Sequence, residues 1–411
     1  MRSGSSAGSA STATCWGCAG SRLTTAGDPT GNLAQRGLHP GLPLTEDRAR
    51  IAARRDRLRA LAVERDLDAI MISSLVNVRY LTGFTGSNGA LVVRPDGADI
   101  LATDGRYTTQ AGAQAPDLEL LIERGCATAL VGRVAETGGD RIGYESHVVT
   151  IDGLGSLQTA AATNRSGVDL LSVGPVVEAL RVIKDTHEIE ALRAACSIAD
   201  AALASLIAAG GLRAGRSERE VGRDLDNRML GLGAEAVSFE TIVAAGANSA
   251  IPHHRPTDAV LVVGDFVKLD FGSTFAGYHS DMTRTLVLGP PADWQREIYD
   301  LVATAQRLGR EALIVGASVV DVDAAARAPI VDAGHGAAFS HGLGHGVGLE
   351  IHEAPALSAL GAGRLAADMA VTVEPGVYLA GRGGVRIEDT LVVGTDGPDL
   401  LTMTSKELVA L

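Results

Sequence analysis

The stretch "VKLDFGSTFAGYHSDMTRT" (267–285) decides the fold, because its first six residues have the make-up of a buried β-strand and yet include Asp270. "VTVEPG" (371–376) repeats this beginning, and "IEDTLV" (387–392) loosely repeats "SDMTRT" (280–285). Both copies read apolar-x-apolar-acid-x-Gly and then acid-x-Thr. The Gly-containing connection in each copy is long enough for its two strands to form a hairpin. The second half of the chain therefore predicts an internal repeat of two similar hairpins.

Four acidic residues occupy equivalent places in these hairpins: Asp270, Asp281, Glu374 and Glu388. Each first-strand acid alternates with apolar residues, so it faces away from the core side of its strand. An approximate two-fold axis would bring the four carboxylates together, and like charges in a low-dielectric site repel unless cations neutralise them. Four acids are enough to hold two divalent ions. Solvated acids on an exposed sheet face are the alternative, but they do not explain the matched Gly and Thr.

Histidines gather in the same part of the chain, since seven of the ten lie between His253 and His352. In "HGLGHGVGLEIH" (341–352), the offset of four residues predicts His341 and His345 on one face of a strand. One imidazole can complete a carboxylate-rich site for two metal ions. The sequence lacks a helical zinc-protease motif and a P-loop.

The order of the predicted elements gives two domains. Helix and strand patterns alternate from Thr45 to Arg181, which predicts an α/β domain with a first helix over 46–64. Capping-box sequences at 185–188 and 217–220 open two helices of the second domain. The other predicted elements are strands at 69–74, 89–93, 98–103, 237–244 and 260–271, and a pair of helices between 293 and 332.

Composition limits the class of protein. Residues 1–44 are rich in small and polar residues and predict a disordered extension, in which Cys15 and Cys18 are read as incidental thiols. Four cysteines in 411 residues predict reduced thiols and no disulfide framework. The net charge of -13 argues against nucleic-acid binding. No membrane-spanning helix is expected, because the Ala-rich run 191–211 contains Arg193 and Asp200.

The motifs together resemble the metallopeptidases with the pita-bread fold, in particular Xaa-Pro dipeptidases (prolidases) and Xaa-Pro aminopeptidases. Those that carry the resemblance to the catalytic domain are "VKLDFGSTFAGYHSDMTRT", "HGLGHGVGLEIHE", "VTVEPGVY" and "GVRIEDT". "VNVRYLTGFTGSNGALVV" (76–93) and "ATDGRYTTQA" (102–111) resemble a creatinase-type N-terminal domain. The resemblance implies an α/β domain over 45–181, followed by an α+β pita-bread domain over 182–411 with an internal pseudo-two-fold repeat.

The same resemblance implies the residues of the site. The metal ligands would be Asp270, Asp281, His345, Glu374 and Glu388, holding two divalent ions that share a bridging hydroxide. Mn²⁺ is expected from the mostly oxygen donors, with Co²⁺ or Zn²⁺ as alternatives. The catalytic residues would be Glu374 as proton relay, His253 and His352 as hydrogen-bond partners of the substrate and the oxyanion, His341 at the proline pocket, and Arg386 paired with a carboxylate.

We therefore expect a cytoplasmic, dimeric metallopeptidase that cleaves Xaa-Pro bonds in dipeptides or at the N-terminus of short peptides. The sequence leaves open which of these substrates it prefers. A metal-free, creatinase-like amidinohydrolase and a non-catalytic peptide-binding protein on the same fold are the alternatives. Both would be expected to have lost metal ligands, whereas all five are present here.

Overall fold

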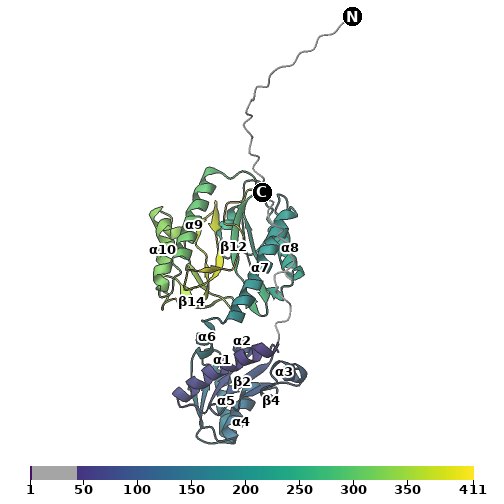
Figure 1. The fold of residues 1–411 in the computed structure, drawn as a ribbon, viewed down its shortest axis with the longest axis vertical. Helices are drawn as coiled ribbons and strands as arrows, with labels where there is room; N and C mark the ends of the chain where they lie inside the picture. The colour runs from purple at the N-terminus through teal and green to yellow at the C-terminus, as the bar shows by residue number, and fades with distance from the viewer. Residues whose placement is uncertain (2–43) are drawn as a thin grey trace.

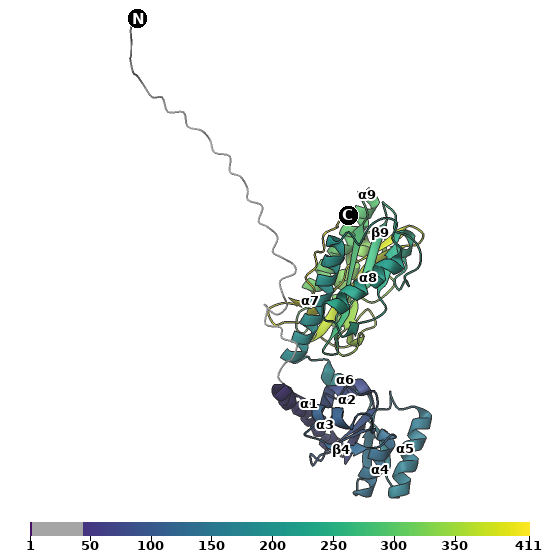
Figure 2. The ribbon, with the colours of Figure 1, turned by 90° about the vertical axis from the view of Figure 1, so that its right-hand side faces the viewer.

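The computed structural model describes residues 44–411 together with Met1 (Figure 1). Except for those two end residues, the predicted extension over 1–44 lies outside the described residues, as do Cys15 and Cys18. The described chain forms two units joined by the short helix α6 (Val176–Arg181). Figure 2 shows the same two units after a quarter turn, with α6 at their junction.

A six-stranded mixed sheet forms the N-terminal unit, in the order β4-β3-β2-β1-β5-β6. β2 pairs antiparallel with both β1 and β3, and the other neighbouring strands, β3–β4, β1–β5 and β5–β6, pair in parallel. The strands are β1 (Ala69–Ile72), β2 (Gly89–Val93), β3 (Ile100–Thr103), β4 (Glu119–Ile122), β5 (Arg141–Tyr144) and β6 (Asp169–Ser172).

Helices cover both faces of this sheet. Alternation along β1 points Ile70 and Ile72 into one apolar cluster with α1 and α2, and Ala69 and Met71 into another with α4 and α5. The cluster under α1 and α2 continues into the second unit through residues such as Tyr278. The helices are α1 (Leu44–Glu64), α2 (Leu75–Thr82), α3 (Thr108–Gln114), α4 (Cys126–Glu136) and α5 (Ile151–Asn164).

The C-terminal unit is built from two similar halves, each with two helices and an antiparallel sheet. Figure 1 shows α7 and α8 on one side of the strands and α9 and α10 on the other. The first half contains α7 (Thr186–Ala208), α8 (Glu218–Gly231), β8 (Ile242–Ala245), β9 (Phe266–Phe271) and β12 (Met282–Val287), with the strand order β12-β9-β8. The second contains α9 (Asp293–Glu311), α10 (Val319–Asp332), β13 (Gly344–Gly346), β14 (Glu353–Leu357), β15 (Ala370–Val373), β18 (Asp389–Val392) and β19 (Asp399–Leu400), in the order β14-β13-β15-β18-β19.

Short elements complete each half. β7 (Ala236–Val237), β10 (Ser273–Phe275) and β11 (Tyr278–His279) form a small sheet, β16 (Gly376–Leu379) pairs with β17 (Gly383–Arg386), and η2 (Gly246–Ala250) and η3 (Gly336–Ala338) are single 3₁₀ turns. An α/β unit followed by an α+β unit with an internal repeat confirms the predicted fold class.

Both predicted capping boxes are present. The Asp185 carboxylate accepts a hydrogen bond from the Glu188 N–H at 3.0 Å and opens α7, and Ser217 and Glu220 open α8 in the same way. α7 has the length and apolar composition of a membrane span, the one such helix found among residues 44–411, but 56% of that stretch is buried inside the domain. Arg193 and Asp200 do not exclude this segment by composition alone, but its burial is that of a core helix in a folded domain.

Two predicted strands are shorter than expected. β9 begins at Phe266 and not near Val260, because Val262 N–H bonds the Asp265 carboxylate at 2.9 Å in a loop where Gly264 has a φ of +97°. The segment predicted as one strand over 237–244 is divided between β7 and β8. Cys126 and Cys196 are free, buried thiols.

Candidate metal centre and substrate pocket

The two hairpins bring the four acids to one place. Their core sides pack as expected, with Val267 and Leu269 in the cluster under α7 and α8, and Val371 and Val373 in the cluster under α9 and α10. The acids are therefore left on the side of each sheet that faces the other half. Asp270 lies inside β9, and each of the other three acids lies directly beside the end of a strand.

The registers of the two hairpins differ by two residues. In the second hairpin, Val373 lies opposite Asp389, so Glu374 and Glu388 follow at the end of the ladder. In the first hairpin, Asp270 lies opposite Thr283, two residues beyond Asp281. The internal two-fold symmetry is thus approximate at the acids themselves.

Threonines from the repeated acid-x-Thr pattern join the hairpins reciprocally. Thr283 donates to the Glu388 carboxylate at 2.6 Å, and Thr390 donates to the backbone oxygen of Asp281 at 2.8 Å. Each threonine therefore serves the acid of the opposite copy. This exchange explains why the threonine recurs with the acid in both copies.

Asp281, His345 and Glu388 offer ligand atoms that all lie within 4.8 Å of one another. His345 Nε2 lies 3.5 Å from both Asp281 Oδ2 and Glu374 Oε1. Asp270 Oδ1 is buried and has no hydrogen-bond partner among the described residues. An imidazole nitrogen and several carboxylate oxygens thus converge without enough hydrogen-bond donors, which is the donor set expected of a site for hard divalent cations.

The raised pKa values of the clustered acids also indicate a site for cations. Burial, followed by repulsion from Glu388 and the other acids, raises the pKa of Asp281 well above its ordinary value. Burial and the charge of Glu374 do the same for the pKa of Glu388, and burial raises the pKa of Glu374 to about 8 despite the Arg386 charge. These carboxyl groups cannot all be ionised near neutral pH unless cations are added to the site.

His345 is oriented so that one nitrogen faces the acids. Its Nδ1–H donates to the backbone oxygen of Gly346 at 3.0 Å, which leaves Nε2 unprotonated toward the cluster. Burial lowers the pKa of His345 to about 4, so the ring stays neutral. A neutral imidazole with an exposed lone pair is the form that binds metal ions.

Arg386 connects the acids to the predicted proline pocket. It donates to Asp270 Oδ2 at 2.5 Å, to Thr283 Oγ1 at 2.9 Å and to the Tyr378 hydroxyl at 2.8 Å. The Tyr378 hydroxyl in turn donates to His341 Nε2 at 2.9 Å, since His341 Nδ1–H donates to a backbone oxygen. Arg386 is therefore held by Asp270 and supports His341 through Tyr378.

All nine predicted site residues line one cavity of about 450 Å³. The five proposed metal ligands are joined there by His253, His341, His352 and Arg386. The His345 and His352 rings meet edge to face, with 4.4 Å between their centroids. The expected relation of His341 and His345 on one strand face is wrong, because β13 spans Gly344–Gly346 only and His341 lies in the loop before it.

Sequence reasoning missed three residues that hold the site. Tyr378 carries the contact between Arg386 and His341, Thr372 donates to Glu374 at 3.4 Å, and Lys268 bonds the backbone beside His253. Tyr378 lies inside the quoted motif "VTVEPGVY", so its proximity to the acids was a usable signal. The other two carry no pattern that distinguishes them from ordinary strand residues.

A second grouping of Glu145, His147 and Glu178 lies in the N-terminal unit. Glu145 already accepts hydrogen bonds from the backbone N–H of Ser73 and of Ser74 and from the Asn77 amide. His147 bonds Glu178 at 2.9 Å. These contacts satisfy the Glu145 oxygens at the start of α2, which is a structural role.

Comparisons with known proteins agree with this geometry. The sequence pattern of metallopeptidase family M24 matches residues 190–395, and that of the creatinase/prolidase N-terminal domain matches residues 54–183. An Xaa-Pro dipeptidase of Pyrococcus furiosus is 36% identical over 352 residues, which covers 84% of this chain and 96% of that protein.

Solved structures cover nearly the whole described chain. An Xaa-Pro dipeptidase from Bacillus anthracis superposes with a TM-score of 0.82 at 38% identity, covering 88% of this chain and all of the other. An X-Pro aminopeptidase from Thermotoga maritima gives a TM-score of 0.80 at 32% identity, covering 87% and 99%. With both sequence patterns in order along one chain, the protein belongs to metallopeptidase family M24 and carries the creatinase/prolidase N-terminal domain.

Proposed function

We propose that this protein hydrolyses the bond between a residue and a following proline, in dipeptides or at the N-terminus of short peptides. The observation that carries the proposal is the meeting of Asp270, Asp281, His345, Glu374 and Glu388 in one cavity that is also lined by four further histidines. The names of the similar proteins, Xaa-Pro dipeptidase and X-Pro aminopeptidase, supply the substrate class.

The five residues fit two divalent cations, because the buried carboxyl groups outnumber the donors around them and Asp270 Oδ1 lacks a partner. When bound, the ions supply Lewis-acid activation of a water and of the peptide carbonyl. Mostly oxygen ligands with one imidazole favour Mn²⁺, with Co²⁺ or Zn²⁺ as alternatives.

The protein groups take the remaining roles. Glu374, a carboxylate that lines the cavity beside His345, is suited to accept a proton and return it to the leaving proline nitrogen. His352, beside His345, and His253, at the open side of the cavity, are suited to hydrogen-bond the substrate and the developing oxyanion. His341 lines the proline pocket, and Arg386 holds Asp270 in place.

A metal-free amidinohydrolase and a peptide-binding protein remain the rival functions. Each would be expected to have lost at least part of the acid cluster, and the complete cluster with an oriented His345 supports the metallopeptidase instead. We also propose domain limits at 45–181 and 182–411, a homodimer, and a location in the cytoplasm.

The test is hydrolysis of Ala-Pro and of Ala-Pro-Ala by the full chain after chelation and after reloading with Mn²⁺. Activity that depends on the metal, with about two ions bound per chain, supports the proposal, and the preferred peptide decides between dipeptidase and aminopeptidase. Turnover by the chelated protein, or tight metal binding without cleavage of either peptide, would reject it. An Asp281→Asn variant is the control, since it removes one proposed ligand and should lose both metal and activity.

A further inference from the structure

Lys268 is a buried amine that the proposed reaction does not use. It lies in β9, the central strand of its sheet, with 0% of the residue exposed. Alternation places it on the same face as Asp270, two residues away, where Tyr378 and Arg386 cover the sheet. The other two lysines bind carboxylates, Lys184 at 3.1 Å and Lys406 at 3.2 Å, whereas Lys268 has no carboxylate within 4.0 Å among residues 44–411.

The partners of Lys268 are two successive backbone oxygens. Its Nζ donates to the oxygen of Ile251 at 2.6 Å and to that of Pro252 at 3.2 Å. Its amine also lies 5.1 Å from the centroid of the Tyr378 ring. Arg386 donates to the same Pro252 oxygen at 3.2 Å. The backbone immediately before His253 is therefore hydrogen-bonded to Lys268 and Arg386, two side chains that lie beside the acids.

The chain after His253 is fixed separately. His254 Nε2 bonds the buried Glu218 carboxylate at 2.8 Å, and Thr257 donates to the same group through its N–H at 3.0 Å and its hydroxyl at 2.7 Å. Glu218 also accepts from the Ala245 N–H at 2.9 Å. His253 is thus the residue between two anchors, and its own ring lines the cavity.

The bonds from Lys268 are not the only way to satisfy this part of the loop. Ile251 is exposed and Pro252 is partly exposed, so the segment lies at the surface, where water is an alternative partner for backbone groups. An apolar side chain at position 268 would suit a central strand better than an amine, whose burial is favourable only when its hydrogen bonds are made. The hydrogen bonds of the Lys268 amine instead fix the distance between the β9 face that carries Asp270 and the backbone beside His253.

We propose that Lys268 is a positioning residue for His253. By bonding the two carbonyls before His253, it holds the imidazole at the distance from the acid cluster that contact with a bound substrate requires. The inference rests on the proposed function, because His253 has a role to be positioned for only if the cavity binds the peptide.

The test is a double-mutant cycle in the metal-loaded full chain, with Lys268→Met and His253→Ala alone and together. Lys268→Met keeps the length of the stem and removes the donors. We expect it to lower kcat/KM for the Xaa-Pro peptide by about 10- to 100-fold, because a misplacement of about 1 Å can have an effect of this size. In the His253→Ala background the same change should lower kcat/KM less than about twofold, since coupled residues are not additive.

Hydrogen exchange supplies a readout that does not depend on activity. Exchange of the backbone over 251–257 should rise in Lys268→Met, while the metal content stays that of the wild type. Lys406→Met is the matched control, because its amine bonds Asp389 and should leave exchange over 251–257 unchanged. If Lys268→Met does not fold, Lys268→Gln keeps a shorter donor and should show the same pattern with a smaller loss.

Three results would overturn the inference. Wild-type kcat/KM in Lys268→Met, an equal loss from Lys268→Met with and without His253, or a loss of bound metal would each show that Lys268 does not act through His253. Failure of the proposed function itself would appear differently, as a wild-type chain that cleaves no Xaa-Pro peptide. In that case, a rise in hydrogen exchange over 251–257 in Lys268→Met would still show that Lys268 fixes this part of the backbone.

Discussion

At the scale of single residues, the site contains more buried carboxylate oxygens than cationic or hydrogen-bond-donating side chains to pair with them. Asp270 illustrates it, because one of its oxygens is bonded by Arg386 at 2.5 Å and the other is buried without a partner. All nine residues predicted from the sequence line the same cavity: the repeated pattern indicated the four acids, and the family resemblance implied His345, His253, His341, His352 and Arg386. Tyr378 and Lys268 were not predicted: Tyr378 had a usable signal in its proximity to Glu374, whereas the partners of Lys268 lie 16 and 17 residues away and follow no local pattern.

Glu374→Gln should reveal the proton relay when its kcat is compared with that of the wild type at equal metal content, because Glu374 is also a proposed metal ligand. The amide keeps the shape of the side chain but cannot accept and return a proton, so kcat should fall by about 10²- to 10⁴-fold. The measurement is kcat for Ala-Pro at saturating Mn²⁺, with bound metal determined in parallel. A variant with full activity would refute the relay role of Glu374.

The stability of the metal-free chain should fall between pH 6.5 and pH 8. Burial raises the pKa of Glu374 from 4.5 to about 8, and the pKa values of Asp281 and Glu388 also rise, so the folded state binds more protons than the unfolded state in this window. Stability therefore decreases as pH rises toward the folded pKa. Thermal unfolding after chelation should give a lower Tm at pH 8.0 than at pH 6.5.

Other groups set the limits of that window. His341 and His345, whose pKa values burial lowers to about 4, favour folding as pH rises to 6.5 and contribute nothing further above it. Lys268, with a pKa lowered by burial to about 6, and Lys406, whose pKa burial also lowers, act in the opposite direction to the three acids. Glu374→Gln should show a smaller decrease in Tm, and Mn²⁺ should stabilise more at pH 8.0 because ligands bind metal in their deprotonated form. An equal or higher Tm of the chelated wild type at pH 8.0 would contradict the assignment.

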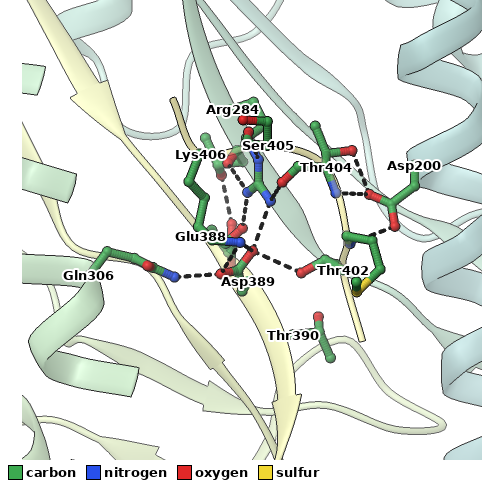
Figure 3. Close-up of polar contacts among 12 residues, drawn as sticks. Asp200, Arg284, Gln306, Glu388, Asp389, Thr390, Thr402, Thr404, Ser405 and Lys406 are labelled. Atoms are coloured by element: carbon green, nitrogen blue, oxygen red, sulfur yellow. Dashed lines mark hydrogen bonds and ion pairs between the residues drawn. The ribbon is translucent and has the colours of Figure 1, made fainter. Parts of the chain in front are cut away.

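At the scale of elements, the start of β18 is fixed by a buried polar network around Asp389, next to Glu388. Figure 3 shows Arg284, Gln306, Thr402 and Lys406 arranged around its carboxylate. Arg284 binds it at 2.8 Å and also donates to the backbone oxygen of Glu388 at 2.5 Å. Burial alone would raise the pKa of Asp389, but the charges of Arg284 and Lys406 outweigh it and keep the pKa low. Ion pairs to Asp389 thus fix the start of β18, directly after the proposed metal ligand Glu388.

Asp389→Ala should destabilise the fold by about 3 to 5 kcal/mol, because it leaves the buried Arg284 without its partner. The free energy of unfolding in urea is the measurement. Thr402→Val is the matched control: it removes one hydrogen bond of 2.9 Å to Asp389 and should lower stability by only about 1 kcal/mol. A loss below about 1 kcal/mol in Asp389→Ala would show that the network is not important for stability.

At the scale of the whole molecule, Arg181 joins the N-terminal unit to the loop that carries His352. It is 2% exposed and donates to Asn77 of α2 at 2.8 Å, to Glu350 at 2.8 Å and to Glu353 at 2.5 Å. The apolar cluster that continues across the junction supports the same contact. The N-terminal unit therefore contacts the loop that carries His352, and His352 lines the cavity.

Arg181→Met should weaken the contact between the N-terminal unit and the loop that carries His352. Glu353 would keep only Lys184 as an ionic partner, and we expect the free energy of unfolding to fall by about 3 kcal/mol, with faster hydrogen exchange over 348–353. Arg193→Met is the control, because its ion pair with Asp399 is about half exposed and should contribute less than about 1 kcal/mol. Unchanged exchange over 348–353 in Arg181→Met would argue that the two units meet without influencing His352.

The sequence by itself determined the order of the elements, the two capping boxes, the repeated hairpins and the four acids of the candidate site. These are local properties, set by the alternation of side chains along a strand and by hydrogen bonds between residues three apart. Only the tertiary structure decided the two-residue difference in register, the exchange of Thr283 and Thr390 between the hairpins, and the bonds from Lys268 and Arg386 to the backbone before His253. Such contacts join segments up to about 135 residues apart, so they depend on how the two halves pack together and not on any pattern within one segment.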